Sequence, residues 1–393
     1  MPLIDFKSEA LALKDQLVAW RRDFHRHPEL GFQEVRTSGL VAKHLRDLGI
    51  EVQTGVGKTG VIGVLEGERP GPVVMLRFDM DALPIQEENQ TDYVSQNPGV
   101  MHACGHDAHT AIGMGIAQLA SKHRARLNGT LKFVFQPAEE GCGGALSMIH
   151  DGALESPRPQ VALGLHVWNE APLGRAEIGA GAVMAAAGVF EILVKGKGGH
   201  GAQPHKTVDA LLTGSAIVNA LQTIVARNIS PRESAVVTVG AFHAGDAFNV
   251  IADTAALTGT FRSFDRATHE LLGRRIREVA EATARALGAT AEVNVRPVSP
   301  ATVNDATVAA TVREIAAEVL GRDQVSPDQF TMGSEDMSEF LERVPGCFFF
   351  LGSRNEAKGF SAPHHNPRFD IDEDVLPLGV AILVQAAVHH LSG

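Results

Sequence analysis

The sequence of 393 residues is poor in cysteine, tryptophan and tyrosine, with three, two and one of these residues. The cysteines Cys104, Cys142 and Cys347 are odd in number and far apart, so we expect no disulfide framework and a reduced, cytoplasmic setting. Basic charge is also short, because 35 Lys and Arg stand against 46 Asp and Glu, for a net charge of -11. A chain of this charge is not expected to bind nucleic acid through a broad basic surface.

Long apolar runs are missing as well. No segment approaches about 18 uninterrupted apolar residues, and the first residues lack the basic and then apolar pattern of a secretory signal, so we expect neither a membrane span nor a leader.

Histidine, by contrast, is abundant, with 17 residues. It is the commonest metal ligand. Histidines on helical patterns, such as His25 and His44, are expected to be solvated or packing residues, so a metal site requires a cluster elsewhere.

The order of apolar segments predicts two domains. Strands alternate with helices over residues 1–185 and again over 297–393, which is typical of an α/β domain with a mixed, largely parallel sheet and helices on both faces. Residues 186–296 instead read β-α-β-β-α-β, the ferredoxin-like α+β unit. We therefore expect one discontinuous domain interrupted by a smaller insertion. Two amphipathic helices are expected in the first 50 residues, the second ending at Gly49.

Residues 101–109, MHACGHDAH, gather three histidines, a cysteine and an acid just before a predicted helix. Thiolate and imidazole are ligands that zinc and related transition metals prefer. A single histidine here would as often cap a helix or fill a core. A cluster this dense favours a metal site.

Three further segments of the same domain carry potential ligands. Glu139 and Glu140 follow the predicted strand 130–135, and adjacent carboxylates at a strand end can face different ways, one toward a metal and one toward a water as general base. His166 ends another apolar strand, and His365 lies in a prolyl loop before the last helix. Each signal alone would be ordinary core or surface structure. Together the four segments supply enough nitrogen, sulfur and oxygen ligands for two metal ions. Three of the four lie at the carboxyl ends of predicted strands, where sites in open α/β sheets are found.

Two glycine-rich segments match nucleotide-binding motifs only weakly. Residues 57–59 end like a phosphate-binding loop, but Val52 occupies the position of its first glycine, and a β-turn is the better prediction. Residues 196–201 satisfy G-x-G-x-x-G after a predicted strand, yet the next helix begins too late for a dinucleotide fingerprint. We expect a loop that exposes His200.

Longer motifs resemble the di-metal aminoacylases, metallopeptidase-like amidohydrolases that include hippurate hydrolases, N-acetyl-amino-acid deacetylases and plant hydrolases of indole-acetyl amino acid conjugates. In chain order they are RFDMDALP at 77–84, the cluster at 101–110, FQPAEE at 135–140, GGHGAQPH at 198–205, NVI at 249–251, GSED at 333–336 and HNP at 365–367. The motifs keep the family's order and span nearly the whole chain, so the resemblance is highly specific.

The resemblance implies a catalytic domain with two divalent metal ions and an inserted lid domain that also forms a homodimer or homotetramer. The metal ligands that it implies are Cys104, His106, Glu140, His166 and His365. Zinc is the expected metal, with manganese, cobalt and nickel as alternatives.

The resemblance also implies roles for residues that do not bind metal. Glu139 is the general base, and Asp79 is an acid that orients the metal site. His200, on the lid, stabilises the oxyanion and reaches across a dimer into the partner's site. Asn249 and Arg262, also on the lid, hold the carboxylate of the substrate.

The implied function is metal-dependent hydrolysis of the amide bond of a small-molecule N-acyl-L-amino acid, of the N-acetyl or N-benzoyl (hippurate-like) type, which releases a carboxylic acid and a free amino acid. Within the family, a metallocarboxypeptidase or dipeptidase and an indole-acetyl-amino-acid hydrolase are alternatives. From other classes, a catalytically silent metal-binding dimer and a dehydrogenase remain open. The pair Glu139-Glu140 argues against the first, and only the weak glycine loop supports the second.

Overall fold

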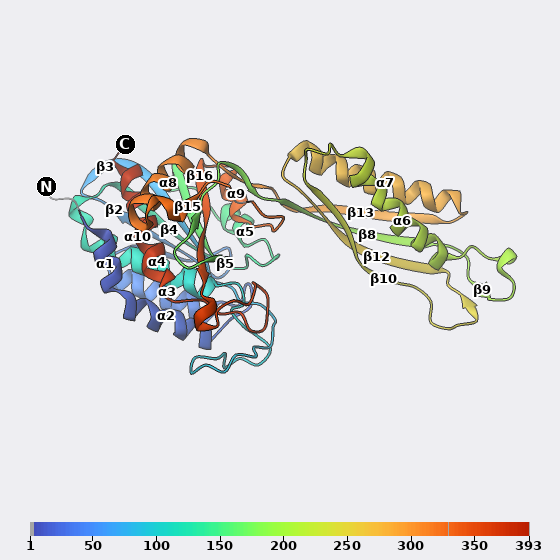
Figure 1. Ribbon diagram of the computed structural model, residues 1–393, viewed down its shortest axis with the longest axis horizontal. Coiled ribbons are helices and arrows are strands. Elements are labelled where there is room, and N and C mark those ends of the chain that lie inside the picture. Colours follow the sequence, from blue (N-terminus) through green and yellow to red (C-terminus); the bar gives the residue numbers. More distant parts are fainter. Residues whose placement is uncertain (1–3, 329, 393) are drawn as a thin grey trace. The chain divides into compact units, whose positions relative to one another are not determined.

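The computed structural model describes residues 4–328 and 330–392, which form two compact units (Figure 1). Unit 1 contains the chain up to Gly181, residues 303–330 and the chain from Asp336 onward, and unit 2 contains Ala182–Thr302 and Thr331–Glu335. The insertion expected at 186–296 lies within unit 2. Two short strands, β7 (Gly181–Met184) and β14 (Thr302–Asn304), pair with each other.

Unit 1 is built on an eight-stranded sheet in the order β1-β2-β4-β3-β5-β16-β6-β15. The strands are β1 (Glu51–Val56), β2 (Gly60–Glu66), β3 (Arg69–Asp79), β4 (Asn128–Gln136), β5 (Val161–Pro172), β6 (Ala176–Glu177), β15 (Val325–Ser326) and β16 (Gly346–Arg354). The four central strands β4, β3, β5 and β16 run parallel, while β2 pairs antiparallel with β4 and β1 pairs antiparallel with β2. The prediction of a mixed, largely parallel sheet is confirmed.

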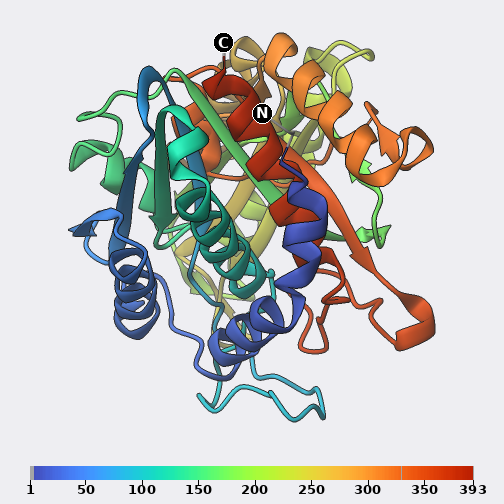
Figure 2. The same ribbon diagram turned by 90° about the vertical axis from the view of Figure 1, so that its left-hand side faces the viewer.

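Alternate residues of the central strands face opposite sides of the sheet. On one side Leu76, Phe133, Leu163 and Phe349 belong to the core of unit 1, where α4 (His106–Lys122) and α10 (Val375–Leu391) cover the strands (Figure 2). On the other side lie α5 (Gly144–His150) and α9 (Met337–Leu341). Further helices are α1 (Phe6–Ala12), α2 (Lys14–Arg26), α3 (Val35–Asp47) and α8 (Ala306–Leu320).

The prediction of two helices before Gly49 is wrong, because three are present. Leu13 ends α1 and precedes α2 while keeping a near-helical backbone, with φ -87° and ψ -2°. The apolar periodicity therefore runs through the break without a visible signal. Gly49 itself has φ +72° and follows the end of α3 as expected, since glycine accepts this conformation without a Cβ clash.

Unit 2 is the ferredoxin-like fold that the sequence predicts. Its antiparallel sheet has the order β10-β12-β8-β13, formed by β8 (Ala186–Lys195), β10 (Ala235–His243), β12 (Thr254–Ser263) and β13 (Thr290–Ser299). Helices α6 (Ala210–Asn228) and α7 (Arg266–Ala286) pack on it. A separate ribbon pairs β9 (Gly199–His200) with β11 (Val250–Ile251).

Helix α6 is long and apolar enough, by length and composition alone, to cross a membrane. That is weak evidence, because core helices of globular domains share both properties. In unit 2, Ile217, Leu221 and Ile224 of α6 are fully buried in a core with Phe190 and Leu257 of the sheet.

Candidate metal centre

The carboxyl ends of three parallel strands meet at one edge of the sheet in unit 1. Asp79, the last residue of β3, pairs with Gln136, the last residue of β4. Arg77 of β3 lies opposite Gly164 of β5, so His166, two residues further on, reaches the level of Asp79. The segment that follows β4 begins at this same edge and carries the two predicted glutamates.

The loop into α4 places Cys104 and His106 at this edge. Gly105, between them, has φ +94°, and a Cβ built there would lie 2.4 Å from the Cγ2 atom of Val167. Only glycine combines this backbone conformation with such close packing. The glycine therefore lets the ligand loop sit directly on β5.

Cys104 is the residue that two groups of potential ligands share. One ligand atom each of Cys104, His106 and His166 lies within 4.8 Å of the others, and the same holds for Cys104, Glu140 and His365. The Cys104 sulfur is 3.4 Å from Nε2 of His166, and Nε2 of His365 is 3.1 Å from a carboxylate oxygen of Glu140. The five predicted metal ligands are thus gathered around one sulfur atom.

Hydrogen bonds that the Nδ1 atoms donate to backbone carbonyls orient two of the imidazoles. Nδ1 of His106 lies 2.8 Å from the carbonyl oxygen of Asp81, and Nδ1 of His166 lies 2.6 Å from that of Val167. A carbonyl accepts only from an N–H, so both rings keep Nε2 free for a ligand role. Nε2 of His106 is buried and has no hydrogen-bond partner among the residues that the structure describes. An orphaned imidazole nitrogen beside a thiol and carboxylates fits a bound cation.

The electrostatics of the cluster also favour a cation. Burial alone lowers the pKa of His106, but Asp79 and Asp81 outweigh it and raise this pKa to about 10. Burial and the carboxylates of Glu140 and Glu139 raise the pKa of the Cys104 thiol well above its usual range. Positive charge at the centre would remove this obstacle to thiolate formation. The donor set and its charge fit divalent metal ions.

Asp79 is fully buried and orients a histidine that was not among the predicted site residues. Its carboxylate accepts a hydrogen bond from Nδ1 of His109 at 2.5 Å and another from Arg77 at 2.7 Å. Burial alone raises the pKa of Asp79, but His106, His109 and Arg77 hold it well below its usual range. Nε2 of His109 in turn accepts from the amide of Val167 at 2.9 Å. The spacing of His106 and His109, three residues apart on one helix face, was the available sequence signal.

Glu139, the predicted base, lies beside the ligands rather than among the atoms nearest the sulfur. Its carboxylate belongs to a group with His106 and Glu140 whose ligand atoms are within 4.8 Å of one another. Asp81, also not predicted, accepts a hydrogen bond from the backbone amide of Glu140 at 3.0 Å. Asp81 therefore contacts both the His106 ring and the Glu140 backbone, and fixes them relative to each other.

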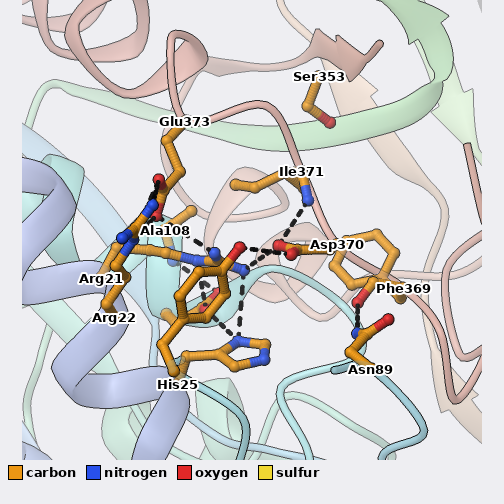
Figure 3. A network of polar contacts seen from close by, with 12 residues as sticks. Arg21, Arg22, His25, Asn89, Ala108, Ser353, Phe369, Asp370, Ile371 and Glu373 are labelled. Carbon is orange, nitrogen blue, oxygen red and sulfur yellow. Dashed lines mark hydrogen bonds and ion pairs between the residues drawn. The ribbon is translucent and has the colours of Figure 1, made fainter. Parts of the chain in front are cut away.

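A buried polar network supports the centre from the helix side (Figure 3). Arg21 of α2 donates to Asp107, next to His106, at 2.8 Å and to Asp370, in the segment after His365, at 2.7 Å. His25, one turn further along α2, contacts Asp107 at 2.7 Å. Burial alone lowers the pKa of Arg21, but the surrounding carboxylates raise it well above its usual range. This cation thus links the two segments that carry His106 and His365.

The other predicted site residues belong to unit 2. His200 in β9 pairs with Val250 of β11, and the amide of Gly201 donates to the carbonyl of Asn249 at 2.8 Å, so the ribbon brings His200 and Asn249 together. Both side chains are exposed. Arg262 lies on β12, outside this ribbon. The glycine-rich segment 196–201 contains β9, and α6 begins only at Ala210, unlike the helix of a dinucleotide-binding turn.

The sequence is similar to those of known proteins over most of its length. The family model described as peptidase family M20/M25/M40 matches residues 75–389. Thermostable carboxypeptidase 1 of Saccharolobus solfataricus is 40% identical, over 96% of each chain. IAA-amino acid hydrolase ILR1-like 4 of Arabidopsis thaliana is 40% identical, over 96% of this chain and 86% of its own. N-acetylcysteine deacetylase of Bacillus subtilis is 38% identical, over 96% and 97%.

The fold is also similar to that of a solved structure. The YXEP protein of Bacillus subtilis, described as a dinuclear metal-binding peptidase of the M20 family, superposes with a TM-score of 0.84 at 35% identity. The match covers 97% of this chain and 99% of that one.

Proposed function

The chain belongs to peptidase family M20/M25/M40, and from this premise we propose that it hydrolyses the amide bond of N-acyl-L-amino acids with the help of two divalent metal ions. The sharing of Cys104 between two ligand groups is the observation that carries the proposal. A single thiolate between two sets of donors suits a pair of ions. His106 and His166 would complete one set, and Glu140 and His365 the other.

When bound, the ions would supply Lewis acidity, which polarises the amide carbonyl and lowers the pKa of the attacking water. Cys104 and three imidazoles favour zinc, while the carboxylate also accepts manganese, cobalt or nickel. Glu139 stands beside this set and takes the proton from the water as the carbonyl is attacked. It then returns the proton to the departing amine, so the base is regenerated after each turnover.

Arg262 supports a substrate that carries a carboxylate. The side chain is partly buried, and among the described residues it has hydrogen bonds to Thr260 and to the carbonyl of Phe261 but no acidic partner. Burial lowers its pKa. A desolvated guanidinium without an acid is well suited to the α-carboxylate of an amino acid, which it can bind in a two-pronged geometry. We assign Asn249 to the same carboxylate.

His200 is assigned to the oxyanion that forms as the carbonyl is attacked. Its ring is exposed, and Nδ1 accepts a hydrogen bond from the amide of Ala202 at 3.0 Å. This leaves Nε2 as a donor. Removing one such donor typically costs about 100- to 1000-fold in kcat.

Unit 2 is also the proposed site of homodimer formation. Leu212, Phe248 and Val250 are exposed apolar side chains of this unit. Strands β10 and β13 form the two edges of its sheet. Sedimentation of the full chain tests this part, with a dimer or tetramer expected and a monomer at micromolar concentration contradicting it.

A metallocarboxypeptidase or dipeptidase is the second candidate, because a relative of similar identity carries a carboxypeptidase name. Both substrate classes present an amide and a carboxylate, so Arg262 does not separate them. They differ at the acyl side, where a dipeptide carries a free amine and an N-acyl amino acid does not.

The deciding experiment is a panel of N-acetyl, N-benzoyl and indole-acetyl amino acids, assayed beside unblocked dipeptides with zinc, manganese, cobalt and nickel. We expect higher kcat/KM for acylated amino acids than for dipeptides with the same C-terminal residue. A preference for the dipeptides would replace the proposal with the second candidate. Activity that persists after full chelation would overturn both.

A further inference from the structure

The turn that follows β4 contains a strained residue immediately before Glu139. Ala138 has φ +54°, in the left-handed region that residues with a Cβ rarely adopt. Such a conformation persists only where the surrounding structure holds it. The residue is fully buried, so the strain is not relieved by solvent or by motion of a free loop.

Hydrogen bonds hold both peptide groups of Ala138. Its amide donates to Oε1 of Glu34 at 2.8 Å, and its carbonyl accepts from the amide of Gly144 at 3.1 Å. Gly31 packs against it so closely that a Cβ there would lie 3.1 Å from the Cβ of Ala138. The segment around Gly31 and Glu34 thus clamps a residue that is 104 positions away in the chain.

Burial of the Glu34 carboxylate costs free energy of desolvation. A role in starting helix α3 does not explain this burial. Glu34 precedes α3 without capping the helix through its side chain, and it is fully buried. Its second oxygen accepts from Oγ1 of Thr59 at 2.5 Å. No ion pair of Glu34 exists in the part of the chain that the structure describes, and burial raises its pKa. Both carboxylate oxygens are therefore used to hold neutral groups.

Two acids each accept a hydrogen bond from a different backbone amide of this turn. Glu34 holds the amide before Glu139, whereas Asp81 holds the amide of Glu140 and contacts the ring of His106. The amide of Gly141 closes the turn on the carbonyl of Glu139 at 2.6 Å. Asp81 is thus tied to the candidate ligands, and Glu34 is tied to the base.

We propose that Glu34 is a positioning residue for Glu139: its carboxylate holds Ala138 in the left-handed conformation that places Glu139 beside the metal ligands, where it faces the attacking water. The inference rests on the proposed role of Glu139 as the base. It assigns Glu34, the buried acid that precedes α3, to turnover and not to metal binding.

The test compares three substitutions of Glu34 in the full chain. Glu34→Met removes the acceptor at similar length, and we expect kcat to fall about 10- to 100-fold, because a misplacement of about 1 Å costs this much. Metal content per chain and KM stay near wild type. Glu34→Gln keeps an acceptor for the Ala138 amide and retains most of the turnover. If Glu34→Met does not fold, Glu34→Asp, which withdraws the acceptor by one methylene, takes its place with the same expectation.

A second substitution separates this role from a general loss of packing. Ala138→Gly removes the steric penalty of a positive φ, so adding it to Glu34→Met restores kcat at least partly. Thr59→Val is the matched control, since it deletes the other hydrogen bond of Glu34 and leaves that of Ala138, and it keeps kcat near wild type. Hydrogen exchange of the peptide covering residues 133–144 provides a readout without activity, with faster exchange in Glu34→Met only.

Glu139→Gln is assayed in parallel to separate the two proposals. If it retains turnover, Glu139 is not the base and the role of Glu34 falls with it. If Glu139→Gln is inactive while Glu34→Met keeps wild-type kcat, only the positioning role is overturned. Loss of metal in proportion to kcat in Glu34→Met also overturns it, because Glu34 would then support the metal ligands.

Discussion

The sulfur of Cys104 lies 3.4 Å from Nε2 of His166, with Nδ1 of that ring bound to the carbonyl of Val167. Cys104 precedes α4, whereas His166 lies on β5, so the contact joins two elements that the sequence separates widely. Because Cys104 also neighbours Glu140 and His365, this one contact connects both halves of the proposed two-ion centre.

Substitution of Cys104 is predicted to remove both metal ions. Cys104→Ala deletes the donor that the two ligand groups share, so the metal content falls below one ion per chain after dialysis. Cys142→Ser is the matched control, since Cys142 is exposed two residues after Glu140 and keeps both ions. Elemental analysis checks this, and a Cys104→Ala protein that retains two ions would show that the thiol is no ligand.

Arg262→Ala is predicted to raise KM about 10- to 100-fold, the loss typical of a charged hydrogen bond. The effect on kcat is small, because the carboxylate is bound equally in ground and transition states. Arg266→Ala, which removes an exposed arginine that pairs with Glu270 within α7, leaves KM unchanged. Equal effects of the two substitutions would refute a specific role for Arg262.

Arg21→Met is predicted to destabilise the fold by about 3–5 kcal/mol, because it leaves Asp107 and Asp370 buried without their cation. Arg26→Met, which removes a half-buried arginine of α2 that donates to the backbone carbonyl of Asp92, is the control, with a change of about 1 kcal/mol or less. Denaturant unfolding measures both. Similar midpoints for the two variants would mean that the network contributes little.

Lys132, which is not among the metal ligands, is predicted to make the stability of the fold depend on pH. It is buried on β4, where its ammonium donates to the carbonyls of Glu155 and Pro157 at 2.5 and 3.1 Å. Burial lowers its pKa from 10.5 to about 8. Between these two pH values the unfolded chain keeps a proton that the folded protein has lost, so stability rises with pH across this window.

Lys132→Met is predicted to lack this rise. The free energy of unfolding of the wild type, relative to the variant, should increase by about 3 kcal/mol from pH 8 to pH 10.5, at about 1.4 kcal/mol per pKa unit. Urea unfolding at several pH values measures the difference. A constant difference across the window would show that Lys132 has an ordinary pKa.

Local pattern was sufficient to predict most of the fold. The short apolar run at residues 130–135 predicted β4, and the change to β-α-β-β-α-β predicted the fold of unit 2. Strand β1 was missed because its residues are mostly exposed, with Val56 the one buried. The break at Leu13 was missed because the helical pattern continues through it.

In the candidate site, too, some residues could be predicted from local sequence motifs and others could not. The candidate ligands could be proposed from the sequence because they lie in short motifs at a strand end, before a helix or in a prolyl loop, and the structure brings these motifs together. Glu34 could not be connected with Ala138, nor Arg21 with Asp370, because these pairs form only when distant segments pack together. His109 was in the motif, but its role depends on a contact with Asp79 that spacing alone does not reveal.

The most direct measurement is a metal titration of the chelated, full-length protein with zinc, in which bound ions and hydrolysis of an N-acetyl amino acid are followed in the same sample. We predict no turnover in the metal-free protein, two ions bound per chain at saturation, and full activity only with the second ion. Undiminished turnover without metal, or full activity with a single bound ion, would contradict the two-ion centre around Cys104.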